Sequence, residues 1–266
     1  MKKASLPFFL LSFLLTTLSC SSDDNAIIDS TDDDNLITQS KTINFIEEKI
    51  YYNGQIDSQS SASFNYENNQ LISLIDGNFK VEFLYDGEKI IESKLFINNV
   101  YEQSNFFVYE GNLLKSVTQE GEQTLFTYQG DVLASKVKKY EDNGNWITFR
   151  SENYQFSNGN ITQQIINQFS NATPFKSTFQ YDDKNSIFKG MNQYLRYFME
   201  FETIDPISKN NKLKTFAYEN MNSSQGVQSH EYVIIYDVDN YPTSVKKYSF
   251  DGVQQELISE LTVIYN

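Results

Sequence analysis

The chain has 266 residues, 39% of them hydrophobic and 15% aromatic, with 21 basic against 35 acidic residues and a formal charge of −14. A surface this acidic repels the phosphates of nucleic acids and of anionic membranes, so the sequence disfavours nucleic-acid partners and membrane attachment through surface charge. The single cysteine and single histidine exclude an internal disulfide and the usual cysteine and histidine ligand set of a zinc site.

The chain opens with Lys2 and Lys3, followed by the uncharged run ASLPFFLLSFLLTTLS. A basic start before a short apolar stretch is typical of an export signal. The run is also shorter than the roughly 20 apolar residues that a membrane-spanning helix needs. We therefore expect residues 1–19 to be a signal peptide that is removed, which leaves 19 basic against 35 acidic residues and a formal charge of −16.

Cys20 comes directly after this leader, preceded by Ser19. The stretch resembles the cleavage site of bacterial lipoproteins, which implies that the Cys20 thiol carries a lipid and becomes the new N-terminus. Residues 21–24, SSDD, resemble the acidic signal that sends lipoproteins of the Bacteroidetes type to the cell surface. The resemblance therefore implies an outer-membrane protein, anchored by its lipid and exposed at the cell surface. A free thiol or an intermolecular disulfide stays open as the alternative role of Cys20.

Residues 20–41 are rich in Ser, Asp, Asn and Thr and contain few apolar side chains. Such a segment cannot bury enough surface to offset the entropy of ordering it, so we expect a flexible acidic tether. The aspartates at 32–34 lack the spacing of a calcium-binding loop. A solvated linker is the interpretation that we favour, and we expect no metal site.

One pattern recurs along residues 42–266: an apolar residue, any residue, an aromatic residue and then a turn. Residues two apart on a strand face the same side, and turns with Asn-Gly or Asp-Gly suit tight hairpins. The pattern predicts one repetitive, mostly β domain, a long antiparallel meander of hairpins, while a curled sheet, a sandwich and an open barrel stay open. The copies are Phe64–Tyr66, Phe83–Tyr85, Phe107–Tyr109, Phe126–Tyr128, Tyr154–Phe156, Phe179–Tyr181, Ile234–Tyr236 and Val263–Tyr265.

These copies resemble the YD (RHS-type) repeats of bacterial surface and secreted proteins, because a tyrosine followed by an acidic residue is kept in YDG, YEG and YDD. Over most of residues 43–266, the chain is similar to uncharacterised Bacteroidetes lipoproteins built from degenerate repeats of this type. The resemblance implies a location and an architecture, and it brings no assigned activity.

The segment NSIFKGMNQYLRYFMEF departs from the strand pattern. Its apolar residues recur at helical spacing, and Asn185 or Ser186 is available as an N-terminal cap. These apolar residues are Ile187, Met191, Leu195, Phe198 and Met199. We expect one amphipathic helix near residues 186–200 that covers an open face or end of the sheet. A groove-binding role for its apolar stripe is the alternative.

Few residues suggest catalysis. His230 lies next to Glu231 within HEYVIIYDV, and the chain has no nucleophile-elbow sequence, so we expect an exposed histidine at a strand edge. A glycosidase needs only two carboxylates at a fixed separation, but most of the acids here occupy turn positions that Asp and Glu favour for backbone reasons. We expect no catalytic residues and no cofactor.

Trp146, the only tryptophan, follows the predicted hairpin tip at residues 142–145. An exposed indole there could stack on a sugar ring or anchor a protein contact, whereas cross-strand packing within the sheet is the interpretation that we favour. The sequence as a whole predicts a non-catalytic cell-surface lipoprotein that displays or binds a glycan or a protein at the envelope. The alternative is a carbohydrate-active hydrolase with paired carboxylates. The sequence does not indicate an oligomeric state.

Overall fold

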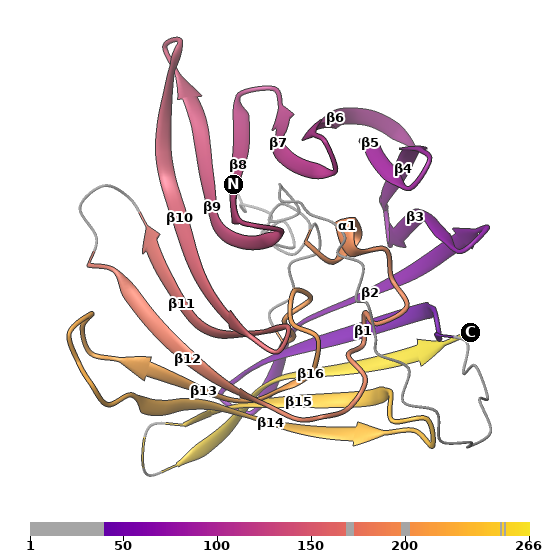
Figure 1. Cartoon of the computed structure of the whole chain (residues 1–266). Helices are drawn as coiled ribbons and strands as arrows, with labels where there is room; N and C mark the ends of the chain where they lie inside the picture. The colour runs from indigo at the N-terminus through magenta and orange to yellow at the C-terminus, as the bar shows by residue number, and fades with distance from the viewer. Residues whose placement is uncertain (1–39, 169–172, 198–202, 251, 253) are drawn as a thin grey trace, which may run out of the picture.

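The computed structural model describes residues 40–168, 173–197, 203–250, 252 and 254–266. Within these residues, sixteen antiparallel strands form a closed barrel in which each strand pairs with the next along the chain and β16 returns to β1 (Figure 1). The predicted antiparallel meander of hairpins is confirmed, and the sheet closes into a barrel. Closure gives every strand two partners, so no sheet edge is left unpaired.

The strands differ in length, from 7 residues in β3 and β7 to 13 in β2 and β10. Their bounds are β1 Ile43–Tyr52, β2 Gln55–Glu67, β3 Gln70–Asp76, β4 Phe79–Asp86, β5 Lys89–Ile97, β6 Val100–Glu110, β7 Leu113–Gln119, β8 Glu122–Gln129, β9 Val132–Asp142, β10 Asn145–Ser157, β11 Asn160–Gln168, β12 Phe175–Tyr181, β13 Lys212–Tyr218, β14 Val227–Tyr236, β15 Pro242–Phe250 and β16 Gln255–Tyr265.

Asparagine and glycine make many of the turns, because they adopt positive φ at low cost. When both central residues of a two-residue turn have positive φ, the turn is of type I′ and its twist matches that of the flanking strands. Five turns have this form: Asn53-Gly54, Asn68-Asn69, Asn98-Asn99, Asn143-Gly144 and Asn158-Gly159.

The hairpins turn alternately at the two ends of the barrel. The turns of the recurring motif, between β2 and β3, β4 and β5, β6 and β7, β8 and β9, β10 and β11, and β14 and β15, share one end, which we call the plug end. The hairpins β1–β2, β3–β4, β5–β6, β7–β8 and β9–β10 turn at the other end, which we call the arm end. The motif thus marks one end of the barrel throughout.

The apolar residue and the aromatic residue of the motif both point into the barrel. The phenylalanines Phe64, Phe83, Phe107 and Phe126 are buried, and a β-bulge next to each motif aromatic re-aims the strand that follows the turn. Three of the motif tyrosines donate from their hydroxyls to the main-chain carbonyl of the second residue in the strand that follows the preceding plug-end turn. These bonds join Tyr85 to Leu71 at 2.8 Å, Tyr109 to Ile90 at 2.9 Å and Tyr128 to Leu114 at 3.0 Å.

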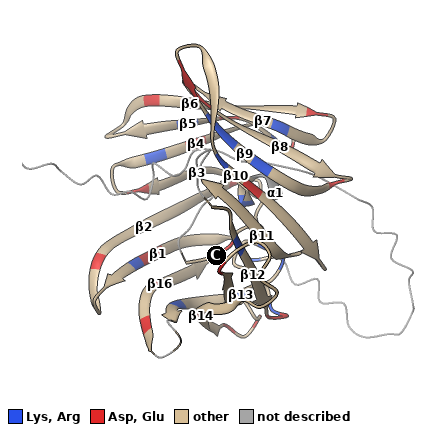
Figure 2. Cartoon of the chain, turned by 90° about the vertical axis from the view of Figure 1, so that its left-hand side faces the viewer, with Lys and Arg blue, Asp and Glu red and all other residues tan. Residues whose placement is uncertain are grey.

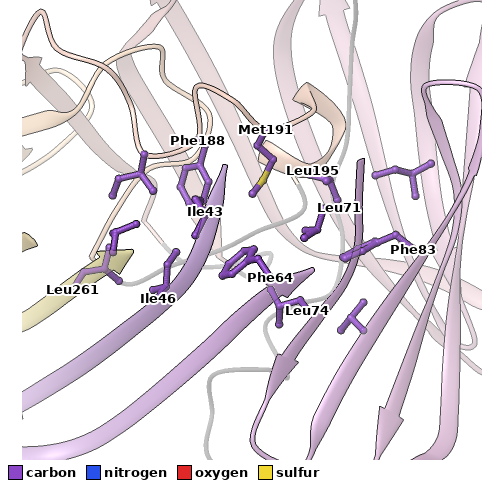
Figure 3. Close-up of a cluster of buried hydrophobic side chains, with 14 of the residues drawn as sticks. Ile43, Ile46, Phe64, Leu71, Leu74, Phe83, Phe188, Met191, Leu195 and Leu261 are labelled. Atoms are coloured by element: carbon purple, nitrogen blue, oxygen red, sulfur yellow. The ribbon is translucent and has the colours of Figure 1, made fainter. Parts of the chain in front are cut away.

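The connection between β12 and β13 lies inside the ring of strands, and we call its described residues, 182–197 and 203–211, the plug (Figure 1). Phe188, Met191 and Leu195 of the plug pack with Ile43 and Phe64 of the wall in a single buried cluster (Figure 3). The core therefore fills the plug end of the barrel.

The prediction of an amphipathic helix near residues 186–200 is wrong. Within the described part of this segment the helical residues are α1, Gln193–Arg196, a single turn. Wall strands surround the plug, so its apolar side chains Ile187, Phe188, Met191 and Leu195 are all buried without the single apolar face that an amphipathic helix needs. Phe198 and Met199, which the prediction also used, lie outside the described residues.

Hydrogen bonds hold the plug in place. The Arg196 guanidinium donates to the carbonyls of Pro206, Ile207 and Ser208 at 2.7–3.1 Å, which ties α1 to the returning chain. Thr203 donates from its main-chain nitrogen to the Glu48 carboxylate of β1 at 3.0 Å. The plug is therefore bonded both to itself and to the barrel wall.

Candidate functional site

Of the two site residues expected from the sequence, Cys20 lies outside the described residues and Trp146 lies on β10. Trp146 pairs with Glu141 of β9 near the tip of their hairpin, and 44% of its surface is exposed. The indole thus stands at the arm end of the barrel, on a hairpin that projects beyond its neighbours in Figure 1. Its exposure leaves the ring accessible to a ligand.

Three long hairpins extend from the arm end, and we call their tips the arms: residues 52–59, 98–102 and 140–148. Every residue in these three ranges is exposed. The arms belong to β1–β2, β5–β6 and β9–β10, whose second strands have 13, 11 and 13 residues. The intervening hairpins β3–β4 and β7–β8 have strands of only 7 and 8 residues. Long and short hairpins therefore alternate around this part of the barrel.

Each arm carries an exposed aromatic ring. Tyr52 is 70% exposed on the first arm and Tyr101 is 54% exposed on the second, while the third carries Trp146 and Tyr140. Sequence reasoning found Trp146 and missed the tyrosines. The uneven spacing of the turn residues could have indicated these tyrosines. A longer interval between two turns gives longer strands, so the hairpin that they form projects beyond its neighbours.

Below the third arm, the inner wall contains a buried ion cluster around Glu152 of β10. The carboxylate accepts from Arg150 Nε at 2.8 Å, Tyr154 Oη at 2.8 Å and Gln164 Nε2 at 2.7 Å, and Lys136 Nζ lies 3.4 Å away. Burial alone would raise the pKa of Glu152, but Lys136, Arg150 and Tyr154 together outweigh it and lower the pKa to about 2. Glu152 is therefore ionised at any ordinary pH.

Neighbouring strands continue this polar inner wall. Asn105 on β6 and Thr124 on β8 are buried, and the oxygens Asn105 Oδ1, Gln119 Oε1 and Thr124 Oγ1 have no hydrogen-bond partner among the described residues. Buried polar atoms of this kind are generally satisfied by bound water. The barrel interior thus changes from apolar at the plug end to polar on the β6–β11 wall toward the arms.

His230 does not lie at an exposed strand edge, so that expectation is wrong. Its strand, β14, pairs with β13 on one side and β15 on the other, and the ring is half-buried beside Ser229 Oγ, 3.0 Å from its Nδ1. Burial, then Lys247 and Lys212, lower the pKa of His230 to about 4. The histidine is consequently neutral near pH 7, and its environment is that of a wall residue.

The arrangement gives little support to hydrolysis by paired carboxylates. Both oxygens of Glu152 are held by neighbouring side chains, and a carboxylate fixed in this way is poorly placed to attack or to move a proton. Glu122 on β8 differs from Glu152, since burial raises the pKa of Glu122. Among the described residues, no group of three or more His, Cys, Asp or Glu side chains is arranged to hold a metal ion.

The outer wall of the barrel is charged at mid-height. Lys80 and Glu82 of β4 form an ion pair at 2.6 Å on the face opposite to the buried Val81 and Phe83. Figure 2 shows lysine, arginine and acidic positions spread over strands on several sides of the barrel. The other mid-strand pairs are Lys49–Glu47, Lys94–Glu92, Lys214–Glu231 and Lys246–Glu260.

Both ends of the described barrel chain meet at the plug end. Lys41 Nζ lies 2.7 Å from Asp237 and 2.6 Å from Asp239, in the β14–β15 turn. The main-chain nitrogen of Asn266 donates to the Thr42 carbonyl at 2.9 Å. The described part of the chain therefore begins and ends at the plug end, opposite to the arms.

No protein-family model matches the chain, and no curated protein is similar to it in sequence. Among solved structures, it is similar to a porin-like protein from Bacteroides uniformis, with 12% identity and a TM-score of 0.55 over 85% of this chain and 99% of that one. A TcdB2–TccC3 structure aligns over 82% of this chain and 11% of that one at 10% identity, but its TM-score of 0.32 supports no comparison of fold. The fold is thus a 16-strand antiparallel barrel that resembles the porin-like protein. No described helix is long and apolar enough to cross a bilayer.

Proposed function

We propose that this chain is a non-catalytic lipoprotein of the outer-membrane surface, whose barrel stands in water and binds its partner through the arms. The observation that carries the proposal is the charged outer wall. A lipid-embedded barrel presents an apolar band about 25 Å tall, and a lysine or arginine on its lipid face costs roughly 2–4 kcal/mol at the midplane. Five ion pairs at mid-strand height fit a wall that faces water.

The inner side of the wall supports the same conclusion. A transmembrane pore has a polar interior around its channel, whereas here the phenylalanines of the motif and the plug fill one end with apolar packing. The name of the porin-like neighbour is compatible with an outer-membrane location. The side-chain pattern of this chain favours attachment to that membrane through a lipid over insertion into it.

The position of Lys41 at the plug end supports an orientation. A lipid on Cys20 would hold the tether, residues 20–41, at the membrane, and the tether joins the barrel beside Asp237 and Asp239. The arms would then point away from the membrane. Exposed aromatic rings at that end favour a binding role over catalysis, because such side chains dominate the contact energy of binding sites.

Two measurements on the chain test this proposal. Labelling cells with a fatty-acid analogue should mark the wild type and not Cys20→Ser; persistent labelling of the variant would refute the lipid anchor. The Cys20→Ser chain without residues 1–19 should remain monodisperse without detergent, because ion pairs lie on its outer wall at mid-strand height. A requirement for detergent would refute the water-facing barrel.

A further inference from the structure

The three arms share a side-chain chemistry that the short hairpins β3–β4 and β7–β8 lack. The first arm holds Tyr52 beside Asn53, Gln55 and Asp57, and the second holds Tyr101 beside Asn98, Asn99 and Glu102. The third holds Trp146 beside the run EDNGN, residues 141–145. All of these residues are exposed. Each arm thus combines an aromatic ring with amide and carboxylate groups in one short solvent-exposed hairpin.

This combination suits a sugar. The C–H face of a pyranose packs on an aromatic ring, as other apolar groups do, while amide and carboxylate side chains bond its hydroxyls. Asn143 and Asn145 flank the tip beside Trp146, and Asn98 and Asn99 lie beside Tyr101. A single arm therefore offers both the stacking surface and the hydrogen-bonding groups for one sugar unit.

The charge of the chain and the spacing of the arms restrict the class of glycan that could bind. The formal charge of −14 disfavours acidic polysaccharides, since like charges repel. Arms on β1–β2 and β5–β6, or on β5–β6 and β9–β10, are four strands apart, which at about 4.8 Å per strand is roughly 19 Å along the wall. A ligand that contacts two arms must consequently be an oligomer of several sugars.

A protein partner fits these surfaces less well. A stable protein interface buries about 800 Å² per partner around a continuous apolar centre. Here the rings stand on separate arms, and the short hairpins β3–β4 and β7–β8 lie between them. Separate stacking sites at regular intervals match a chain of repeating units better than one compact surface.

We propose, resting on the function proposed above, that the arms bind an extended neutral glycan by stacking successive sugars on Trp146, Tyr101 and Tyr52. Because each arm contributes a separate weak contact, a glycan long enough to reach two arms gains affinity by effective concentration. The affinity should therefore depend strongly on the length of the glycan. It should also require an aromatic ring on every arm that the glycan contacts.

Trp146 provides a direct reporter, since it is the only tryptophan of the chain. The Cys20→Ser chain without residues 1–19 is titrated with neutral gluco-, manno- and xylo-oligosaccharides, from disaccharide to octasaccharide, and with an acidic oligogalacturonate series. Tryptophan emission and calorimetry are recorded for each. At least one neutral series should shift the Trp146 emission saturably, with an affinity that rises roughly a hundredfold from disaccharide to octasaccharide. The acidic series should have no effect.

Two substitutions and one control locate the site. Tyr101→Ala should abolish the gain with length and leave the disaccharide response of Trp146 unchanged, and Trp146→Ala should weaken octasaccharide binding at least about tenfold by calorimetry. Phe106→Ala is the matched control, because Phe106 is 53% exposed on the wall but lies outside the arms. It should bind as the parent does.

Four outcomes would overturn the inference. The first is no response to any neutral series by either method, and the second is an affinity independent of length. The third is preference for the acidic series, and the fourth is full binding by Trp146→Ala. If no glycan binds and a photo-crosslinker placed at position 146 joins the chain to another polypeptide, the ligand is a protein instead. None of these results alters the lipid-label or detergent tests, so failure of the glycan inference is distinguishable from failure of the proposed function.

Discussion

The tyrosine of the recurring motif has a role that only neighbouring copies reveal. The motif predicted correctly that its apolar and aromatic residues share one face, because strand alternation is a local property. It did not predict that Tyr109 donates to the Ile90 carbonyl or Tyr128 to the Leu114 carbonyl, since those bonds depend on the register between hairpins. Each bond adds about 1 kcal/mol by usual estimates, and together they link consecutive copies.

Glu152 joins the charged and polar side chains of β9, β10 and β11 on the inner wall. Glu152→Gln keeps the shape of the side chain but removes the carboxylate charge that Lys136 and Arg150 contact. Removing one partner from a buried ion cluster typically costs about 3–5 kcal/mol, so we expect a loss of that order in the free energy of unfolding. Chemical denaturation of both chains measures it.

The same substitution also changes the response to acid. The pKa of Glu152 is about 2 in the folded chain against a usual 4.5, so its contribution to stability is present above the usual value and is lost as the pH falls toward 2. Glu152→Gln should lack this part of the acid dependence. Glu110→Gln, which breaks the exposed pair with Lys115, is the control and should change stability by less than about 1 kcal/mol. An equal loss in both variants would contradict the prediction.

At the scale of elements, the plug is where sequence reasoning failed. Helical spacing of apolar residues was real, but Gly190 and Asn192 interrupt the segment with poor helix formers, and the surrounding wall buries apolar groups on every side. No local pattern reports that a segment is enclosed by strands from elsewhere in the chain. The arms, by contrast, could have been read from the positions of the turn residues.

Gly190 tests how closely the plug packs against the start of the barrel. A Cβ at this position would lie 2.3 Å from the main-chain oxygen of Lys41, a contact that no backbone atom tolerates. Gly190→Ala should therefore push the plug away from residues 41–42 and lower the free energy of unfolding by about 1–3 kcal/mol. Lys189→Ala, at the exposed neighbouring position, should have little effect. Thermal denaturation of the wild type and the two variants compares their stability. Unchanged stability of Gly190→Ala would contradict the prediction, because it would mean that the backbone near Lys41 moves away at no cost.

For the whole molecule, closure was the step that sequence could not decide. An open meander, a sandwich and a barrel contain the same hairpins, and the difference lies in one pairing, β1 with β16, between residues more than two hundred positions apart in the chain. That pairing satisfies two strands that would otherwise expose their edges. The location and the ligand of the protein are even less predictable from local sequence patterns than closure is.

Closure makes a prediction about the C-terminal strand. Deleting residues 255–266 removes β16 and leaves β1 and β15 with unpaired edges, which promote aggregation. We expect this chain to lose its monomeric form on size-exclusion chromatography, whereas deleting Asn266 alone should preserve it. A stable folded monomer without β16 would mean that the sheet does not depend on being closed.

The separation of the turns into two groups has a consequence for how this protein can change. Because the motif and the plug occupy one end, the opposite hairpins can be lengthened by pairs of residues, one on each strand, while the register of the wall stays the same. New recognition loops could therefore be grafted onto the β3–β4 or β7–β8 tips without redesigning the interior. The barrel is thus a scaffold in which the plug end stays constant while the loops of the opposite end can vary.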